Sequence, residues 1–103
     1  MTATAKLMQA MDAKGKAIGA ICAAPLALKA AGVLKENYTC YPGTDKKIAW
    51  GRFHPDQAVV EDGNVMTSRG PGTAVCFGLA IVRKLQGDAT YRQVKNGLLS
   101  DYC

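Results

Sequence analysis

The feature that most constrains the fold of this chain is a short apolar run, Lys16–Cys22, that lies between two segments of helical character. Apolar side chains recur at helical spacing in Ala5–Ala13, and Gly15 follows where a helix would end. A second helix is predicted over Ala23–Ala30, because Pro25 fits a first turn, where its missing N–H costs nothing. An apolar run of this length between two helices is typical of a buried parallel strand.

The remainder of the chain continues this alternation of strands and helices. Asp62-Gly63, between two β-prone segments, is a strong hairpin signal. The order of elements predicts one α/β domain over residues 1–103. A buried strand needs neighbours on both sides and the chain offers few, so we expect N-terminal strands to be missing. The further predicted elements are a strand at Tyr38–Tyr41, a short helix and loop over Asp45–Phe53, hairpin strands at Ala58–Glu61 and Asn64–Ser68, a helix capped by Thr73 whose face of Val75, Leu79, Val82 and Leu85 is core, and a last helix, Ala89–Leu99, with Val94 and Leu98 facing inward.

Composition and charge exclude several classes of protein. Hydrophobic residues make up 49% of the 103 residues, which excludes a disordered tail. The net charge of +5 comes from basic residues scattered along the chain, without the clustered charge and interleaved aromatics of a nucleic-acid binder. The first residues lack a secretory signal, and no apolar run is long enough to span a bilayer. We therefore expect a cytoplasmic protein without nucleic-acid or membrane partners.

The four cysteines are Cys22, Cys40, Cys76 and Cys103. They form no C-x-x-C pair, and the single histidine, His54, is not near any of them, so we expect no metal site and no cofactor. A reducing compartment with free thiols fits this pattern. Cys40 and Cys76 are interpreted as packing residues, Cys103 as an exposed terminal thiol and His54 as a surface residue.

Cys22 lies at the junction of the predicted buried strand and the following helix. A tight turn there lets its thiol project from the sheet edge, as in a nucleophile elbow. The partial positive charge of a helix N-terminus favours the thiolate, and the N–H groups of Ala23 and Ala24 would be free to receive an oxyanion. Position alone leaves open the alternative that Cys22 is a small buried core residue.

Two motifs, Ala20-Ile-Cys-Ala-Ala-Pro25 and Thr67-Ser-Arg-Gly-Pro-Gly-Thr73, occur in the order and spacing of the ThiJ/PfpI superfamily. The intervening Thr39-Cys-Tyr-Pro42 and Val60-Glu-Asp-Gly63 fit the same pattern, as does Phe77-Gly-Leu-Ala-Ile-Val82. Together these segments cover nearly the whole chain. The whole chain therefore resembles the C-terminal half of the domain of this superfamily, in the branch of the parkinsonism-associated deglycase.

The resemblance implies a flavodoxin-like three-layer α/β sandwich that is usually dimeric. It also implies cofactor-free glyoxalase or deglycase chemistry on small methylglyoxal-like aldehydes, together with redox sensing and chaperone action. In such a site Cys22 is the nucleophile and Ala23 supplies an oxyanion-hole N–H. Ser68, Arg69 and Gly70 form a loop that borders the substrate pocket.

Departures from the family pattern qualify that implication. The family domain is about twice as long, and its N-terminal half supplies the acidic general base, onto which none of the eight acids here maps. Some members have a histidine where this chain has Tyr41, whose reference pKa of about 10 excludes a neutral-pH base. The protease-like branch has a histidine in place of Ala23, which counts against peptidase activity.

Three functional hypotheses follow from these observations. The first is a cysteine-dependent glyoxalase or deglycase that needs an N-terminal half as a companion chain. The second is a redox sensor or chaperone with an oxidisable Cys22 and no turnover. The third is an inactive fragment, whose open strand edges would make it bind its missing half or form an extensive homodimer.

Overall fold

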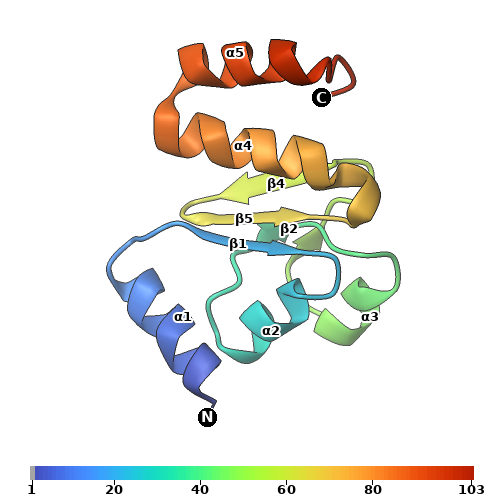
Figure 1. Ribbon diagram of the computed structural model, residues 1–103. Helices are drawn as coiled ribbons and strands as arrows, with labels where there is room; N and C mark the ends of the chain where they lie inside the picture. The colour runs from blue at the N-terminus through green and yellow to red at the C-terminus, as the bar shows by residue number, and fades with distance from the viewer. Residues whose placement is uncertain (1) are drawn as a thin grey trace.

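Helices cover both faces of a short mixed sheet in the computed structural model, which describes residues 2–103 (Figure 1). One face carries α4, with α5 packed outside it, and the opposite side carries α1, α2 and α3. The α/β class and its layered arrangement are as the sequence predicts. The elements are α1 Ala3–Ala13, β1 Ile18–Ile21, α2 Pro25–Ala30, β2 Asn37–Tyr38, α3 Thr44–Ile48, β3 Arg52–Phe53, β4 Val59–Asp62, β5 Val65–Ser68, the 3₁₀ turn η1 Pro71–Thr73, α4 Ala74–Gln86 and α5 Asp88–Leu98.

The larger sheet has the strand order β1-β5-β4. Strand β1 runs parallel to β5, with Ile18 opposite Val65, and β4 and β5 form an antiparallel hairpin that turns at Gly63, where φ is 60°. Strands β2 and β3 form a separate parallel pair. Within residues 2–103, β1 pairs along one edge only, so its second edge is open.

The hydrophobic core lies between β1, β5 and the helices α1, α2 and α3. Ile18 and Ala20 point into this core. Gly19 faces the opposite way, where a Cβ would come within 3.0 Å of the Phe77 ring on α4. Glycine therefore lets α4 approach the strand closely. The other buried members are Leu28, Ala31, Val33, Leu34, Tyr38, Cys40, Ile48 and Val65.

The apolar stripe predicted as core on α4 is buried only at its centre. Leu79 is 2% exposed, whereas Val75 and Leu85 are 41% and 65% exposed. A helix of this length spans about 20 Å, but a four-residue strand spans only about 13 Å, so the ends of α4 extend beyond the sheet. The inward position predicted for Leu98 on α5 is also wrong, because this side chain is 57% exposed.

The middle of the chain differs in detail from its prediction. The strand expected over Tyr38–Tyr41 is the shorter β2, which begins at Asn37, and the expected short helix is α3. The second strand of this small pair, β3, was not predicted. No helix within residues 2–103 is long and apolar enough to cross a bilayer.

The expectation of four free thiols is wrong, because Cys76 and Cys103 form a disulfide. Cys22 and Cys40 are the free cysteines of the described chain. The pairing follows from the antiparallel arrangement of α4 and α5, which are joined at Gly87. From Cys76 to the end of α4 and back along α5 the chain travels about 15 Å each way, so its end returns to the first turn of α4.

Candidate active site

Cys22 directly follows β1 and has a left-handed backbone conformation, with φ of 66°. Such a conformation costs a non-glycine residue about 1–2 kcal/mol, so its surroundings must hold it. The Cys22 N–H donates to the carbonyl of Ser68 at 3.1 Å, and its own carbonyl accepts the N–H of Tyr41 at 2.8 Å. The side chain is half-buried and its thiol is free, which is the arrangement expected of a nucleophile elbow.

The backbone after Cys22 offers one amide donor rather than the two expected. The Ala24 N–H donates to the carbonyl of Ile21 at 3.1 Å, so it is occupied. The Ala23 N–H makes no hydrogen bond within residues 2–103 and lies one residue after the thiol. An oxyanion formed on a group bound to Cys22 can therefore be received by Ala23 alone among these two amides.

The loop Ser68–Gly70 adjoins the elbow through Ser68. Ser68 is fully buried, its hydroxyl donates to the Ala58 carbonyl at 2.6 Å, and its carbonyl accepts the Cys22 N–H. The place of Ser68 in a loop that borders a substrate pocket stays a prediction. The structure gives Ser68 the role of holding Cys22 in position.

Arg69 is half-buried and anchored at two backbone carbonyls. Its Nε donates to Cys40 at 3.2 Å and its Nη1 donates to Pro55 at 2.6 Å, while the guanidinium lies 5.6 Å from the centre of the Phe53 ring. A guanidinium has five N–H donors, so donors remain for an anionic group. Gly70 is buried against Tyr41, whose ring would lie 3.3 Å from a Cβ at this position.

Thr73 organises this loop, and sequence reasoning assigned it a different role. Its hydroxyl accepts the N–H groups of Arg69 at 3.2 Å and Gly70 at 3.1 Å, donates to the Gly70 carbonyl and lies 2.6 Å from the Ser68 hydroxyl. It makes no side-chain cap bond to α4, contrary to its prediction as a helix cap. A threonine three residues after a glycine in a tight turn is the signal that could have revealed this role.

The other polar candidates make no side-chain hydrogen bond to Cys22 within residues 2–103. His54 is half-buried rather than on the surface, and its Nε2 lies 3.0 Å from the Asn37 Oδ1. Tyr41 is 49% exposed and contributes its backbone N–H to the elbow. No carboxylate within residues 2–103 hydrogen-bonds to Cys22, and no group of His, Cys, Asp and Glu there could hold a metal ion.

The second free thiol, Cys40, has a contrasting environment. It is completely buried, and burial raises the pKa of its thiol to about 11, with the negative charge of Asp45 acting in the same direction. The Cys40 thiol therefore stays protonated near neutral pH and serves as packing, as predicted. Among the described residues, Cys22 alone combines a free thiol with partial exposure.

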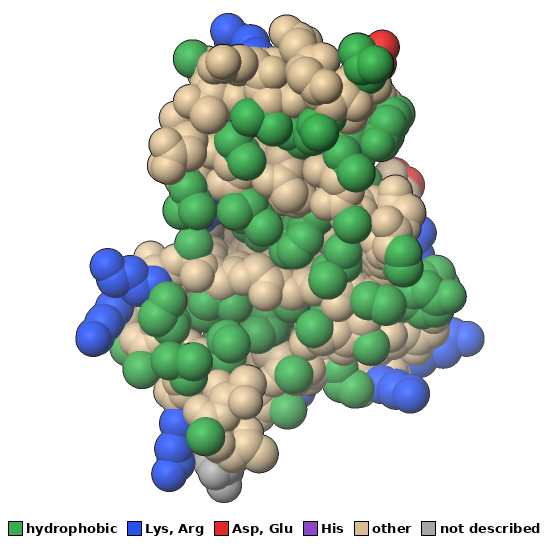
Figure 2. All heavy atoms as spheres, viewed as in Figure 1, with side chains coloured by type: hydrophobic (Ala, Val, Ile, Leu, Met, Phe, Trp, Pro, Cys, Tyr) green, Lys and Arg blue, Asp and Glu red, His purple; other side chains and the backbone are tan. Residues whose placement is uncertain are grey.

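A groove of 730 Å³ runs beside the elbow, between α1, β1 and α2. Its walls consist mainly of small and apolar side chains, among them Met8, Ala20, Ala24 and Ala27. Figure 2 shows hydrophobic side chains gathered across the middle of this face, with Lys and Arg at its rim.

Comparison with known proteins identifies relatives of similar sequence. Protein dj-1beta of Drosophila melanogaster is 40% identical over 98 residues, which cover 93% of this chain and 52% of the relative. The glutathione-independent glyoxalase DJR-1.2 of Caenorhabditis elegans is 40% identical over 99 residues, which cover 95% of this chain and 51% of the relative. The chain thus spans about half the length of the curated relatives it matches.

Solved structures agree with the sequence comparisons. The crystal structure of Drosophila melanogaster DJ-1beta superimposes with a TM-score of 0.87 at 39% identity, over 92% of this chain and 52% of that one. Oxidized Toxoplasma gondii DJ-1 superimposes with a TM-score of 0.83 at 26% identity, over 95% and 54% of the two chains. The flavodoxin-like fold class is therefore confirmed. The sequence profile of the DJ-1/PfpI family matches residues 1–84, and the chain belongs to this family.

Proposed function

We propose that the protein is a cysteine-dependent glyoxalase or deglycase-type enzyme that acts on methylglyoxal-like aldehydes. The observation that carries this proposal is the elbow itself, where a half-exposed free thiol adjoins the unoccupied N–H of Ala23. The name of the nematode relative, a glutathione-independent glyoxalase, supports the same chemistry.

The proposed reaction needs no oxidant or reductant. The Cys22 thiolate adds to the aldehyde carbon of methylglyoxal, and the carbonyl oxygen becomes an oxyanion that the Ala23 N–H receives before it takes a proton. A base then removes the proton from the former aldehyde carbon, and a proton returns to the neighbouring carbon. The product is a lactate thioester, which water hydrolyses to lactate and free Cys22.

The base is the part of this mechanism that residues 2–103 do not supply at Cys22. We propose that a carboxylate from the N-terminal half of the family domain, which this chain does not span, provides the base. This half would be present as a companion segment or chain. Addition to Cys22 then needs only this chain, whereas turnover needs both halves.

Intact mass measurement and a lactate assay distinguish addition from turnover. We expect methylglyoxal to add to Cys22 of the chain alone and to leave Cys40 unmodified, because Cys40 is buried and protonated. Cys22→Ser should abolish both the adduct and any lactate production, whereas the matched Cys40→Ser should retain them. Equal adduct formation or turnover in the Cys22→Ser protein would contradict the proposal.

The contrast between the two thiols also supports a second candidate function, redox sensing without turnover. Cys22 is the accessible free thiol of the described chain, and the disulfide already protects Cys76 and Cys103. Mild peroxide followed by peptide mapping should add oxygen to Cys22 well before Cys40. Oxidation of both residues at the same rate would argue against a selectively reactive thiol at Cys22. If methylglyoxal does not add to Cys22 and peroxide does not oxidise it before Cys40, the third hypothesis, an inactive fragment, is supported.

A further inference from the structure

The disulfide between Cys76 and Cys103 joins the end of the chain to the first turn of α4, with 5.3 Å between the two Cα atoms. It closes the open end of the helical hairpin formed by α4 and α5. Neither cysteine has a role in the elbow at Cys22, so the disulfide requires an explanation of its own.

Apart from the disulfide, α5 packs mainly along α4. The helix has no buried residue. The ion pair between Arg83 and Asp88 spans 3.1 Å, but both side chains are more than half exposed, and such pairs contribute little. The Arg83 guanidinium lies 3.8 Å from the centre of the Tyr91 ring, and the buried Ser100 bonds within its own segment, to the Lys95 carbonyl. The disulfide is therefore the covalent link that holds the far end of α5 to α4, whereas the contacts between them leave no residue of α5 buried.

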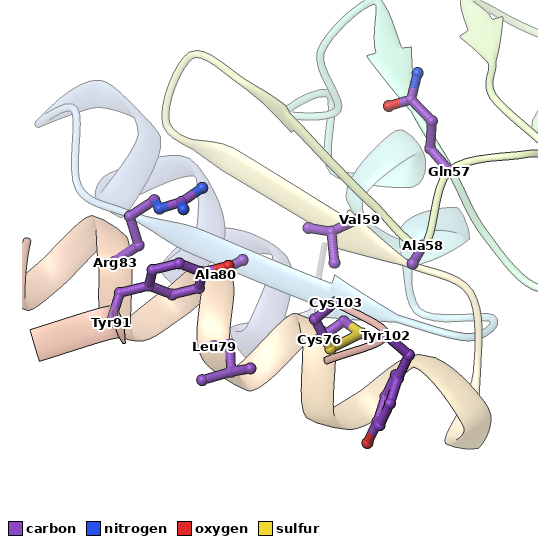
Figure 3. A pocket seen from close by; sticks show the side chains of 10 residues that line it. All are labelled: Gln57, Ala58, Val59, Cys76, Leu79, Ala80, Arg83, Tyr91, Tyr102 and Cys103. Carbon is purple, nitrogen blue, oxygen red and sulfur yellow. A yellow bond between two sulfur atoms is a disulfide. The ribbon is translucent and has the colours of Figure 1, made fainter. Parts of the chain in front are cut away.

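The disulfide is also accessible. A pocket of 340 Å³ lies between the start of β4 and the two helices, and both cysteines line it (Figure 3). Cys103 is exposed, and Cys76 is half-buried. A small thiol can therefore approach the sulfur of Cys103, with Cys76 as the leaving group.

We propose that Cys76–Cys103 is a second redox site of this protein, separate from Cys22, that exchanges with dithiol reductants and controls the docking of α5 on α4. In the oxidised form the disulfide holds α5 in place. In the reduced form α5 leaves, and Tyr91, Tyr102 and Cys103 are lost from the wall of the pocket.

The exchange balances as a two-electron reaction. One thiolate of the dithiol attacks the Cys103 sulfur, the protein S–S bond breaks, and the Cys76 thiolate leaves and takes a proton from water. The second thiol of the reductant then displaces Cys103 from the mixed disulfide. The dithiol ends as a cyclic disulfide, and the protein ends with two thiols. The second step is intramolecular in a dithiol, which favours this class over single thiols.

Hydrogen exchange on the full 103-residue chain tests the proposal, with dithiothreitol as the dithiol. We expect the amides of α5 to exchange at least about tenfold faster after reduction, with those of β1 and β5 unchanged. Cys103→Ser, at the exposed end of the chain, should show fast α5 exchange with or without dithiothreitol. Cys22→Ser should respond to dithiothreitol as the parent chain does, because the disulfide does not involve it.

Intact mass under non-reducing conditions establishes the state of the disulfide in each sample. The proposal would be overturned by α5 exchange that stays slow after complete reduction, or that is already fast in the oxidised chain. Slow exchange of α5 in Cys103→Ser would overturn it equally.

Discussion

At the scale of single residues, the position of Cys22 depends on backbone hydrogen bonds to two neighbouring segments. Ser68 and Tyr41 fix the strained backbone of the elbow through one hydrogen bond each. Thr73 in turn fixes the loop that contains Ser68. The conformation of Cys22 therefore depends indirectly on the hydroxyl of Thr73.

Thr73→Val tests this dependence, because it replaces the hydroxyl with a methyl group of similar volume. The N–H groups of Arg69 and Gly70 lose their acceptor, and we expect the free energy of unfolding to fall by about 1–3 kcal/mol. Urea denaturation measures the loss. Thr73→Ser keeps the hydroxyl and should retain most of the stability; an equal loss in both variants would show that the methyl group matters instead.

At the scale of elements, one carboxylate joins β2 to β4. The Asp62 Oδ2 accepts the N–H of Asn37 at 3.0 Å and its side-chain amide at 3.2 Å. These two hydrogen bonds, the backbone one foremost, hold the pKa of Asp62 below its ordinary value of 3.8. The Lys35 ammonium likewise lowers the pKa of Asp12, with help from Asn64.

Stability should therefore depend on pH in the acid range. A carboxyl whose pKa is lower in the folded than in the unfolded chain stabilises the fold above the unfolded pKa, and this stabilisation is lost as pH falls through the folded pKa. We expect urea midpoints to fall steadily between about pH 5 and pH 2. Asp62→Asn should be less stable than the parent near neutral pH and should lose less on acidification. An unchanged acid dependence in this variant would exclude Asp62 as a contributor.

The elements show which parts of the fold a sequence can predict. The apolar run before Cys22 and the Asp62-Gly63 turn each carry a local signal, and β1 and the hairpin form where those signals lie. Strand β3 has only two residues, Arg52 and Phe53, and depends on its partner β2 rather than on any pattern of its own. The overhang of α4 depends on the length of strands elsewhere in the chain, so its periodicity alone misplaced Val75 and Leu85.

The same distinction applies to the candidate site. The motif around Cys22 predicts the elbow, because a strand end, a turn and a helix start are all local features. The occupation of the Ala24 N–H arises from turn geometry that residue types do not specify. The hydrogen bonds of Thr73 had a sequence signal, its spacing from Gly70, but that signal does not say which N–H groups the hydroxyl accepts. The pairing of Cys76 with Cys103 arises from the return of α5 along α4, across 27 residues of sequence.

At the scale of the whole molecule, the open edge of β1 lies beside the apolar groove between α1 and α2. The N–H groups of Ile18 and Cys22 point toward β5, so those of Gly19 and Ile21 point toward the open edge. An apolar face next to unpaired strand groups favours association. We therefore predict that the chain binds a companion half-domain or a second copy through this face.

Native mass spectrometry with a matched pair of variants tests this prediction. Ala27→Asp places a charge in the groove and should shift the population strongly toward the single chain. Ala89→Asp makes the same change on the exposed first turn of α5, outside the groove, and should leave association unaltered. A parent chain that stays monomeric at all concentrations, both alone and with a companion half-domain added, would contradict the prediction.

The disulfide also changes how the intact molecule would respond to a protease. Residues 76–103 form a covalent ring, and the link between the two helices at Gly87 is its exposed corner. A single cut there leaves both fragments joined through Cys76 and Cys103, so the nicked protein keeps its size on a non-reducing gel. Reduction would then remove the last covalent bond between the fragments, and the cut protein would separate into residues up to the link and a free α5 peptide.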